Sequence, residues 1–157
     1  MPQLSFNQKE VQFNWENIGI KTRVEKNKIY FFDPIRKRYL LVTPEEEVRQ
    51  WVIHHLTSVL GYPSTTISVE KQIKYLNRNK RFDVLVYKDS KPALLIECKA
   101  PHIAIDQSAL NQIATYNFVL QVPYLLLTNG TKQICCSVDS LNKTYEFLEA
   151  LPTYKEL

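Results

Sequence analysis

Two short apolar runs that carry charged residues constrain the fold of this chain most. Residues 81–87 (RFDVLVY) and 93–99 (ALLIECK) flank the segment KDSKP, which is typical of a turn. A hairpin centred on this segment would place Asp83 opposite Glu97. Because strand side chains alternate between faces, Glu97 and Lys99 share one face of the second strand. The sequence therefore predicts three ionisable groups on one side of a largely apolar hairpin.

A buried charge is costly unless it is paired or binds a metal ion. Mg²⁺ prefers oxygen ligands and typically takes one or two carboxylates, so Asp83 and Glu97 suit Mg²⁺, with Mn²⁺ as a substitute. A metal ion there would activate water and offset charge on a phosphate, and Lys99 would orient the water or help deprotonate it. This pattern favours metal-dependent phosphodiester cleavage. The structural alternative is a salt bridge between Glu97 and either Lys99 or Arg81.

A third carboxylate is expected from a helix that begins at residue 44. Glu45 lies on the same helical stripe as Val48, whereas Glu46 lies at the edge of this stripe and Glu47 points to solvent. Glu45 either adds a metal ligand, directly or through water, or it only favours the helix dipole and pairs with Arg49 one turn later.

A basic run precedes the first apolar strand. Residues 71–81 contain five basic residues and no acid, and they form either a solvated loop or a segment that contacts phosphates. Glu70, just before the run, is expected to be exposed, the alternative being that it faces the acidic cluster. The basic residues are Lys71, Lys74, Arg78, Lys80 and Arg81.

The remaining pattern predicts an α/β fold with a mixed β-sheet flanked by helices. Thr43 and Pro44 open the first helix, which Gly61 ends, and Asp106 caps a second helix that reaches about Leu120. Residues 1–27 are polar and weakly patterned. A hairpin is expected over 28–32 and 38–42, strands over 66–69, 72–76, 123–128 and 133–138, and a strand or short helix over 144–151. We therefore divide the chain into an N-terminal extension, 1–42, and a main domain, 43–157.

Composition narrows the class of protein. The 157 residues are 45% hydrophobic and 23% charged, which is typical of a globular domain, and the net charge of +4 is compatible with nucleic acid. Three glycines exclude a Walker-type loop or a dinucleotide fingerprint. No segment approaches the roughly 20 apolar residues that span a bilayer. Three cysteines make no disulfide framework, so a cytoplasmic location without membrane association is expected.

Other chemistries have weaker support. His54 and His55 are adjacent on a helix and point in different directions, and His102 has no partner at the spacing of zinc ligands. Cys98 faces away from Glu97 on its strand, which disfavours it as a nucleophile acting with that carboxylate.

Five segments, taken in order, resemble the PD-(D/E)XK nuclease superfamily. More narrowly, the chain is similar to the N-terminal nuclease domain of type I restriction enzyme R subunits. The proline of the superfamily's name is absent, because Phe82 precedes Asp83. The matching segments are TPEEEVRQ (43–50), RFDVLVY (81–87), LLIECKA (94–100), QIATY (112–116) and LLLTNG (125–130).

The resemblance implies a restriction-endonuclease-like fold and Mg²⁺-dependent cleavage of DNA. Its implied metal ligands are Asp83, Glu97, Glu45 and the backbone carbonyl of Cys98, and Lys99 completes the E-x-K motif.

The resemblance also implies partners. Gln112 and Tyr116 match a Q-x-x-x-Y element that would support the site or contact DNA. Restriction enzymes of this type carry a motor and work with specificity and methylation subunits, so other restriction subunits are expected partners. A homodimer is compatible with double-strand cutting, which usually needs two active sites. One alternative is a nucleic-acid-binding or accessory module that cuts only with a partner, or never. Another is a protein that retains the fold for a purely structural or interaction role.

Overall fold

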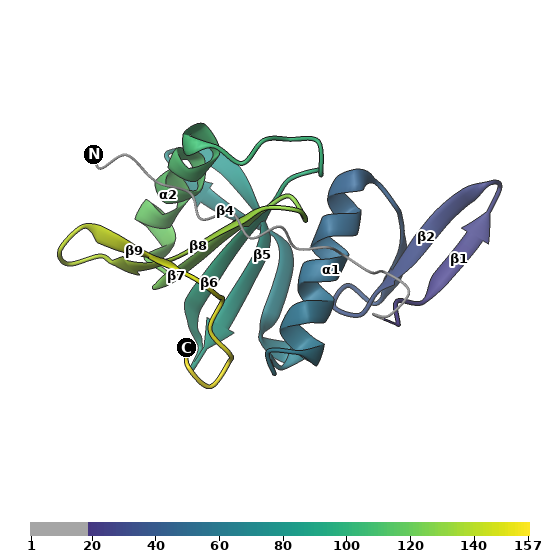
Figure 1. Ribbon diagram of the computed structural model, residues 1–157, viewed down its shortest axis with the longest axis horizontal. Coiled ribbons are helices and arrows are strands. Elements are labelled where there is room, and N and C mark those ends of the chain that lie inside the picture. Colours follow the sequence, from purple (N-terminus) through teal and green to yellow (C-terminus); the bar gives the residue numbers. More distant parts are fainter. Residues whose placement is uncertain (1–18) are drawn as a thin grey trace.

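The computed structural model describes residues 19–157, apart from the side chain of Tyr75, and contains two sheets (Figure 1). Strands β1 to β3 form an antiparallel three-stranded sheet, and the other six follow in the order β4-β5-β6-β7-β8-β9. Only β6 and β7 pair in parallel among these strands, so the six-stranded sheet is mixed. The predicted α/β fold is confirmed. The strands are Thr22–Glu25 (β1), Lys28–Asp33 (β2), Arg38–Leu41 (β3), Ile67–Tyr75 (β4), Arg78–Lys88 (β5), Lys91–Cys98 (β6), Tyr124–Thr128 (β7), Gln133–Asp139 (β8) and Thr144–Leu148 (β9).

Both predicted helices form with the expected caps. In α1 (Pro44–Ser58), the Thr43 hydroxyl accepts a hydrogen bond from the backbone N–H of Glu46 at 3.1 Å. In α2 (Gln107–Leu120), Asp106 accepts from the N–H of Ala109 at 3.0 Å. These bonds satisfy backbone donors that have no partner inside the helix. A short 3₁₀ turn, η2 (Ser64–Thr66), leads from α1 into β4. Neither helix is long and apolar enough to cross a membrane, in the part of the chain that the structure describes.

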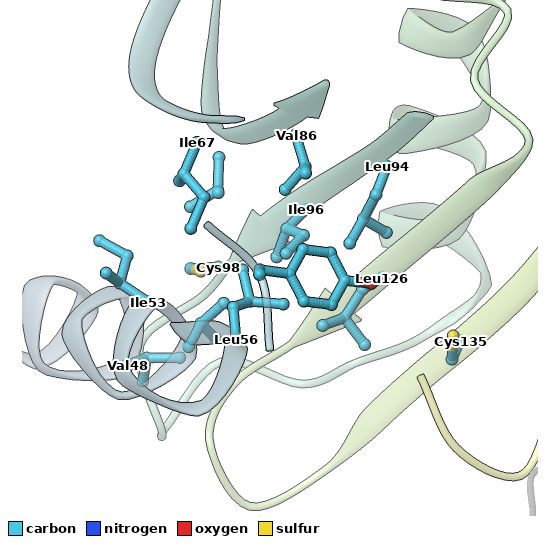
Figure 2. Packing of buried hydrophobic residues seen from close by; sticks show 13 residues of the cluster. Val48, Ile53, Leu56, Ile67, Val86, Leu94, Ile96, Cys98, Leu126 and Cys135 are labelled. Atoms are coloured by element: carbon cyan, nitrogen blue, oxygen red, sulfur yellow. The ribbon is translucent and has the colours of Figure 1, made fainter. Parts of the chain in front are cut away.

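The inner strands of the six-stranded sheet, β5 to β8, are buried on both faces, because they send alternate side chains to two cores. One core joins the sheet to α1, as Figure 2 shows, and the other joins it to α2. The two helices thus lie on either side of this sheet. The α1 core includes Val48, Ile53, Leu56, Val86, Leu94, Ile96 and Cys98, and the α2 core includes Leu85, Leu95, Leu110, Ile113 and Leu127.

The hairpin predicted from residues 81–99 is confirmed. Asp89 and Ser90 both have positive φ, as in the two-residue type I′ turns that match the twist of a hairpin. Val84 pairs with Ile96, and continuing this register places Asp83 opposite Glu97.

Several local expectations differ from the structure. The basic run is not a loop, because its residues lie in the hairpin of β4 and β5, closed by a turn at residues 76–77. β4 is one strand that continues through Glu70, which has a φ of +53°. The prediction missed β1 inside the weakly patterned N-terminal region, of which residues 1–18 lie outside the described residues. The ambiguous C-terminal segment is a strand, β9.

Candidate active site

The two predicted metal-binding carboxylates come together where β5 and β6 cease to pair, at the middle of β5 and the end of β6. Asp83 Oδ2 accepts a hydrogen bond from the backbone N–H of Cys98 at 2.7 Å, directly beyond the last paired residues of the two strands. Lys99 follows β6, and its Nζ lies 3.3 Å from Glu97 Oε1. Asp83, Glu97 and Lys99 thus lie close together, and the Cys98 side chain packs into the α1 core as expected.

Glu97 is the least satisfied acid of this group. Its side chain is only 12% exposed, and its Oε2 is buried with no hydrogen-bond partner in residues 19–157. Burial raises the pKa of Glu97 to about 7, and the charge of Asp83 adds to this rise while Lys99 opposes it. A protonated Glu97 is therefore accessible near neutral pH. The free oxygen can also accept a cation.

Arg49 of α1 joins the helix to the acids of the sheet. Its Nη2 donates to Asp83 Oδ1 at 2.8 Å and to Glu45 Oε1 at 2.9 Å. Burial alone would lower the pKa of Arg49, but the charges of Asp83 and Glu46 outweigh burial and raise it. The pairing of Glu45 with Arg49, considered in the sequence, is therefore present. Glu45 also adds to the raised pKa of Glu97, and its side chain stays 47% exposed.

The expectation for Glu46 was wrong, because Glu46 is buried rather than placed at the edge of the apolar stripe. Its carboxylate accepts hydrogen bonds from Arg36 and Arg49, and from Gln50 Nε2 at 3.0 Å. Glu46, Arg49 and Gln50 share one helical stripe with Ile53. This stripe has charged side chains near the start of the helix and an apolar core residue further along. The ion pair between Glu46 and Arg49 is therefore formed within α1 and lies beside the site.

Residues of the β2–β3 turn complete this ion-pair cluster, and the sequence analysis did not find them. Asp33, fully buried at the end of β2, accepts from Arg36 Nε at 2.6 Å and from Gln50 at 2.8 Å. Asp33 also accepts from the N–H groups of Ile35 and Arg36, a turn motif that Asp-Pro-x-Arg favours. Burial raises the pKa of Asp33, but the hydrogen bonds and charge of Arg36 outweigh it and lower the pKa below 3.8.

Glu70 faces the acidic cluster, which corrects the expectation that it is exposed. It accepts from Arg36 Nη1 at 3.0 Å, and it lies 3.8 Å from Arg49 and 3.7 Å from Arg81. Arg81 therefore pairs with Glu70, whereas Lys99 provides the ion pair of Glu97. We call Asp33, Arg36, Glu46, Arg49, Gln50 and Glu70 the buried ion-pair cluster.

Gln112 and Tyr116, the two residues of the Q-x-x-x-Y element, lie one turn apart on α2. Gln112 Nε2 donates to the Tyr116 hydroxyl at 3.0 Å, and Tyr116 packs edge-on against Phe82, next to Asp83 in sequence. Lys80 lies over the Tyr116 ring, 5.2 Å from its centroid. Four of the five basic residues at positions 71–81 are exposed, and Lys80 is half-buried; the exposed ones are Lys71, Lys74, Arg78 and Arg81.

The site fits Mg²⁺ better than a metal that needs a full set of protein ligands. Among the described residues, no three His, Cys, Asp or Glu side chains form a metal-binding group, so Glu45 does not converge with Asp83 and Glu97 as a third ligand. Glu97 supplies a buried oxygen without a partner, and Asp83 lies beside it. Two carboxylates with remaining positions for water and phosphate are what Mg²⁺ usually requires in proteins.

A comparison with protein families shows which family this chain belongs to. A model described as type I restriction enzyme R protein N terminus (HSDR_N) matches residues 44–152. The chain belongs to this family. No curated protein matches it. A fragment structure of an HsdR subunit of a type I restriction enzyme from Vibrio vulnificus YJ016 has a similar fold, with a TM-score of 0.55 and 21% sequence identity. The similarity covers 74% of this chain and 24% of that protein.

The HSDR_N match contains the predicted site acids but not the whole buried ion-pair cluster. Asp83, Glu97 and Lys99 lie inside residues 44–152, whereas Asp33 and Arg36 lie outside them. The β2–β3 turn therefore adds two buried charged side chains to a site whose other members belong to the family segment.

Proposed function

We propose that this chain is a metal-dependent DNA endonuclease of the PD-(D/E)XK type. The observation that supports this proposal best is the buried, unpartnered Glu97 Oε2 beside Asp83. An acid with a raised pKa and a free oxygen is poorly explained as a structural salt bridge, because its ion pair with Lys99 leaves one oxygen unsatisfied. A divalent cation would satisfy this oxygen.

Asp83, Glu97 and the backbone carbonyl of Cys98 would hold Mg²⁺, with Glu45 as a further ligand through water. The ion would lower the pKa of a bound water and offset charge on the phosphate. Lys99 would hold the attacking water by a hydrogen bond and stabilise the charged phosphoryl group. Its ammonium donates to Glu97 and has further N–H groups available for this role.

The residues around the site would bind the DNA backbone. The basic side chains at positions 71–81 are available for this role, and two of them lie near the site: Lys80 lies over the Tyr116 ring, and Arg81 lies 3.7 Å from Glu70. Gln112 and Tyr116 would support the site or contact DNA from α2. Cutting of both strands would need two copies of the site, so we propose a homodimer, or assembly with other restriction subunits.

The second candidate is an accessory module that binds nucleic acid and cuts only with a partner, or never. Arg49 favours it, because its guanidinium already occupies Asp83 Oδ1, where a metal ligand would be expected to be free. In this reading Arg49 supplies the positive charge and no metal is needed.

Cleavage of supercoiled and linear DNA by the pure chain, with Mg²⁺, Mn²⁺ or EDTA, separates the two candidates. We expect cleavage that requires the metal and is lost in Asp83→Asn. Lys99→Ala should lower the rate by about 10²–10⁴, as for loss of a positioned proton-transfer group. Lys91→Ala is a matched control, since Lys91 is an exposed lysine at the other end of β6. Equal activity in the wild type and the Asp83 and Lys99 variants would refute the nuclease. DNA binding without cleavage would support the accessory module.

A further inference from the structure

The positive charge of the chain is concentrated in its three-stranded sheet. Residues 19–41 contain seven Lys or Arg and two Asp or Glu, whereas residues 42–157 contain twelve of each. Residues 1–18 contain one Lys and two Glu. The 23 residues that span β1 to β3 therefore carry a net charge of +5, residues 1–18 carry −1, and the rest of the chain is neutral. Like charges so close in sequence repel one another, so this excess is not explained by the stability of the sheet.

One face of this sheet interleaves cations with aromatic rings. The guanidinium of Arg23 lies 5.5 Å from the centroid of Tyr30 and 4.6 Å from that of Tyr39. The rings of Tyr39 and Phe32 meet edge-on at 5.3 Å, and Lys21 lies 5.9 Å from the centroid of Phe32. Strand alternation adds Lys28 to this face, together with the acid Glu25 directly opposite it on β1. We call Lys21, Arg23, Lys28, Tyr30, Phe32 and Tyr39 the aromatic face.

The aromatic face is accessible to a ligand. Strand alternation places Phe31 and Asp33 on the opposite face of β2, where both are buried. Figure 1 shows β1 and β2 extending beyond α1, away from the six-stranded sheet. The Arg23 side chain is 51% exposed and Tyr39 is 36% exposed. The face therefore lies on the outside of the molecule.

Internal packing does not account for the cations of this region. Arg23 pairs with Glu25 at 3.4 Å, and Arg36 pairs with Asp33. Both acids of residues 19–41 are therefore already paired. Lys21 and Lys28 form no ion pair with an acid within residues 19–157. Their charges are thus available to an anionic partner.

We propose that the aromatic face binds single-stranded DNA and delivers it to the candidate active site. Only the delivery step rests on the proposed function; the binding of single-stranded DNA does not. Lys21, Arg23 and Lys28 would contact phosphates, and unstacked bases would stack on Tyr39 and the neighbouring rings. Phosphate contacts alone would suit a duplex equally well, but aromatic rings bind bases only when the bases leave the helix.

β2 sets the geometry of the delivery. It runs from Lys28 at the outer end of the sheet to Asp33, which is buried next to Gln50 in the ion-pair cluster. Five steps along a strand cover roughly 16 Å. A nucleic acid strand lying along β2 therefore leads from the aromatic face toward the ion-pair cluster, in which Arg49 contacts Asp83.

Binding of fluorescent dT₂₀ to the full chain in EDTA tests this inference without requiring catalysis. We expect Tyr39→Leu, which keeps an apolar side chain, to weaken binding about tenfold, and Tyr39→Phe to bind as the wild type does. Arg23→Ala/Lys28→Ala should lower the slope of log Kd against log salt by about 1.4, that is, about 0.7 for each lost phosphate contact. The control Lys91→Ala/Lys143→Ala removes the same charge from two exposed positions, the start of β6 and the turn before β9.

Each result has a defined meaning. Tyr39→Leu, checked for folding by circular dichroism, must lose affinity for dT₂₀ more than for a duplex of the same length. Equal loss in the Lys91/Lys143 control, an unchanged Kd in Tyr39→Leu, or no binding of dT₂₀ by the wild type would each overturn the inference. A chain that binds dT₂₀ as expected but never cuts DNA would refute the nuclease proposal and leave this binding surface standing.

Discussion

Arg49 Nη2 donates to Asp83 Oδ1 at 2.8 Å, which links α1 to β5 across 34 residues of sequence. The same guanidinium contacts Glu45 and the buried Glu46. One cation therefore balances carboxylates from two elements of the fold, and the acids of the site depend on the docking of α1.

Replacing Arg49 by Met should destabilise the protein by roughly 3–5 kcal/mol, because Glu46 and Asp83 would keep their charges without the partner. Urea unfolding followed by circular dichroism would measure this loss. Arg23→Met is the control: Arg23 is half-exposed, so we expect a change within about 0.5 kcal/mol. An unfolding midpoint that stays constant in Arg49→Met would mean that the two acids do not need this cation.

Arg36→Ala should also be destabilising, by roughly 2–4 kcal/mol, although Arg36 lies on a surface turn. Its side chain is 12% exposed and contacts Asp33, Glu46 and Glu70. The neighbouring Lys37 is exposed, so Lys37→Ala is a matched control with little expected effect. Thermal unfolding of both variants would make the comparison, and equal melting temperatures would contradict the importance of the ion-pair cluster.

Glu97 should make the metal-free protein less stable as pH rises. Its pKa is raised from 4.5 to about 7, so between these values the folded state keeps a proton that the unfolded state has released. Stability therefore falls as pH rises through this window, by on the order of 3 kcal/mol at most. Unfolding in EDTA from pH 5 to pH 8 should show this slope in the wild type and a flatter profile in Glu97→Gln.

Addition of Mg²⁺ gives a second readout of the same carboxylate. Because a metal ligand must be deprotonated, we expect Mg²⁺ to raise the melting temperature more at pH 8 than at pH 5. In Glu97→Gln this difference should be lost. A stabilisation by Mg²⁺ that is independent of pH would place its binding elsewhere.

The β4–β5 turn offers a stabilising substitution. Leu76 has a φ of +45° and is 77% exposed. Its left-handed backbone is therefore strained, and burial of its side chain does not offset this strain. Leu76→Asn combined with Asn77→Gly gives the sequence that type I′ turns favour, and we expect a gain of about 1 kcal/mol, or about 2–4 °C in Tm. Leu76→Ala keeps the strained backbone, so an equal gain in Leu76→Ala would contradict this explanation.

The sequence predicted the parts of the fold that local chemistry determines. Thr43 and Asp106 are caps because their side chains bond to backbone groups three residues away. The turn around Ser90 and the alternation along β6 placed Asp83 near Glu97. Each of these features depends on neighbours in sequence.

The rest of the site depends on partners that are distant in sequence. Helical periodicity gave Glu45 the buried position, but Glu46 is the buried acid because Arg36 approaches it from the β2–β3 turn. Glu70 looked exposed in the sequence because nothing near it indicated that its backbone would turn it toward Arg36 and Arg49. The spacing of residues along the sequence cannot indicate ion pairs between segments that are distant in the same chain.

The position of Asp33 and Arg36 has a consequence for where this protein can be divided. A polypeptide starting at residue 44, where the family match begins, would retain all six strands of the larger sheet and both helices. It would nevertheless lack Arg36, which donates to Glu46, and Asp33, which accepts from Gln50. The family match therefore begins after two residues that the buried ion-pair cluster uses, so side-chain pairing rather than strand pairing limits where the chain can be shortened.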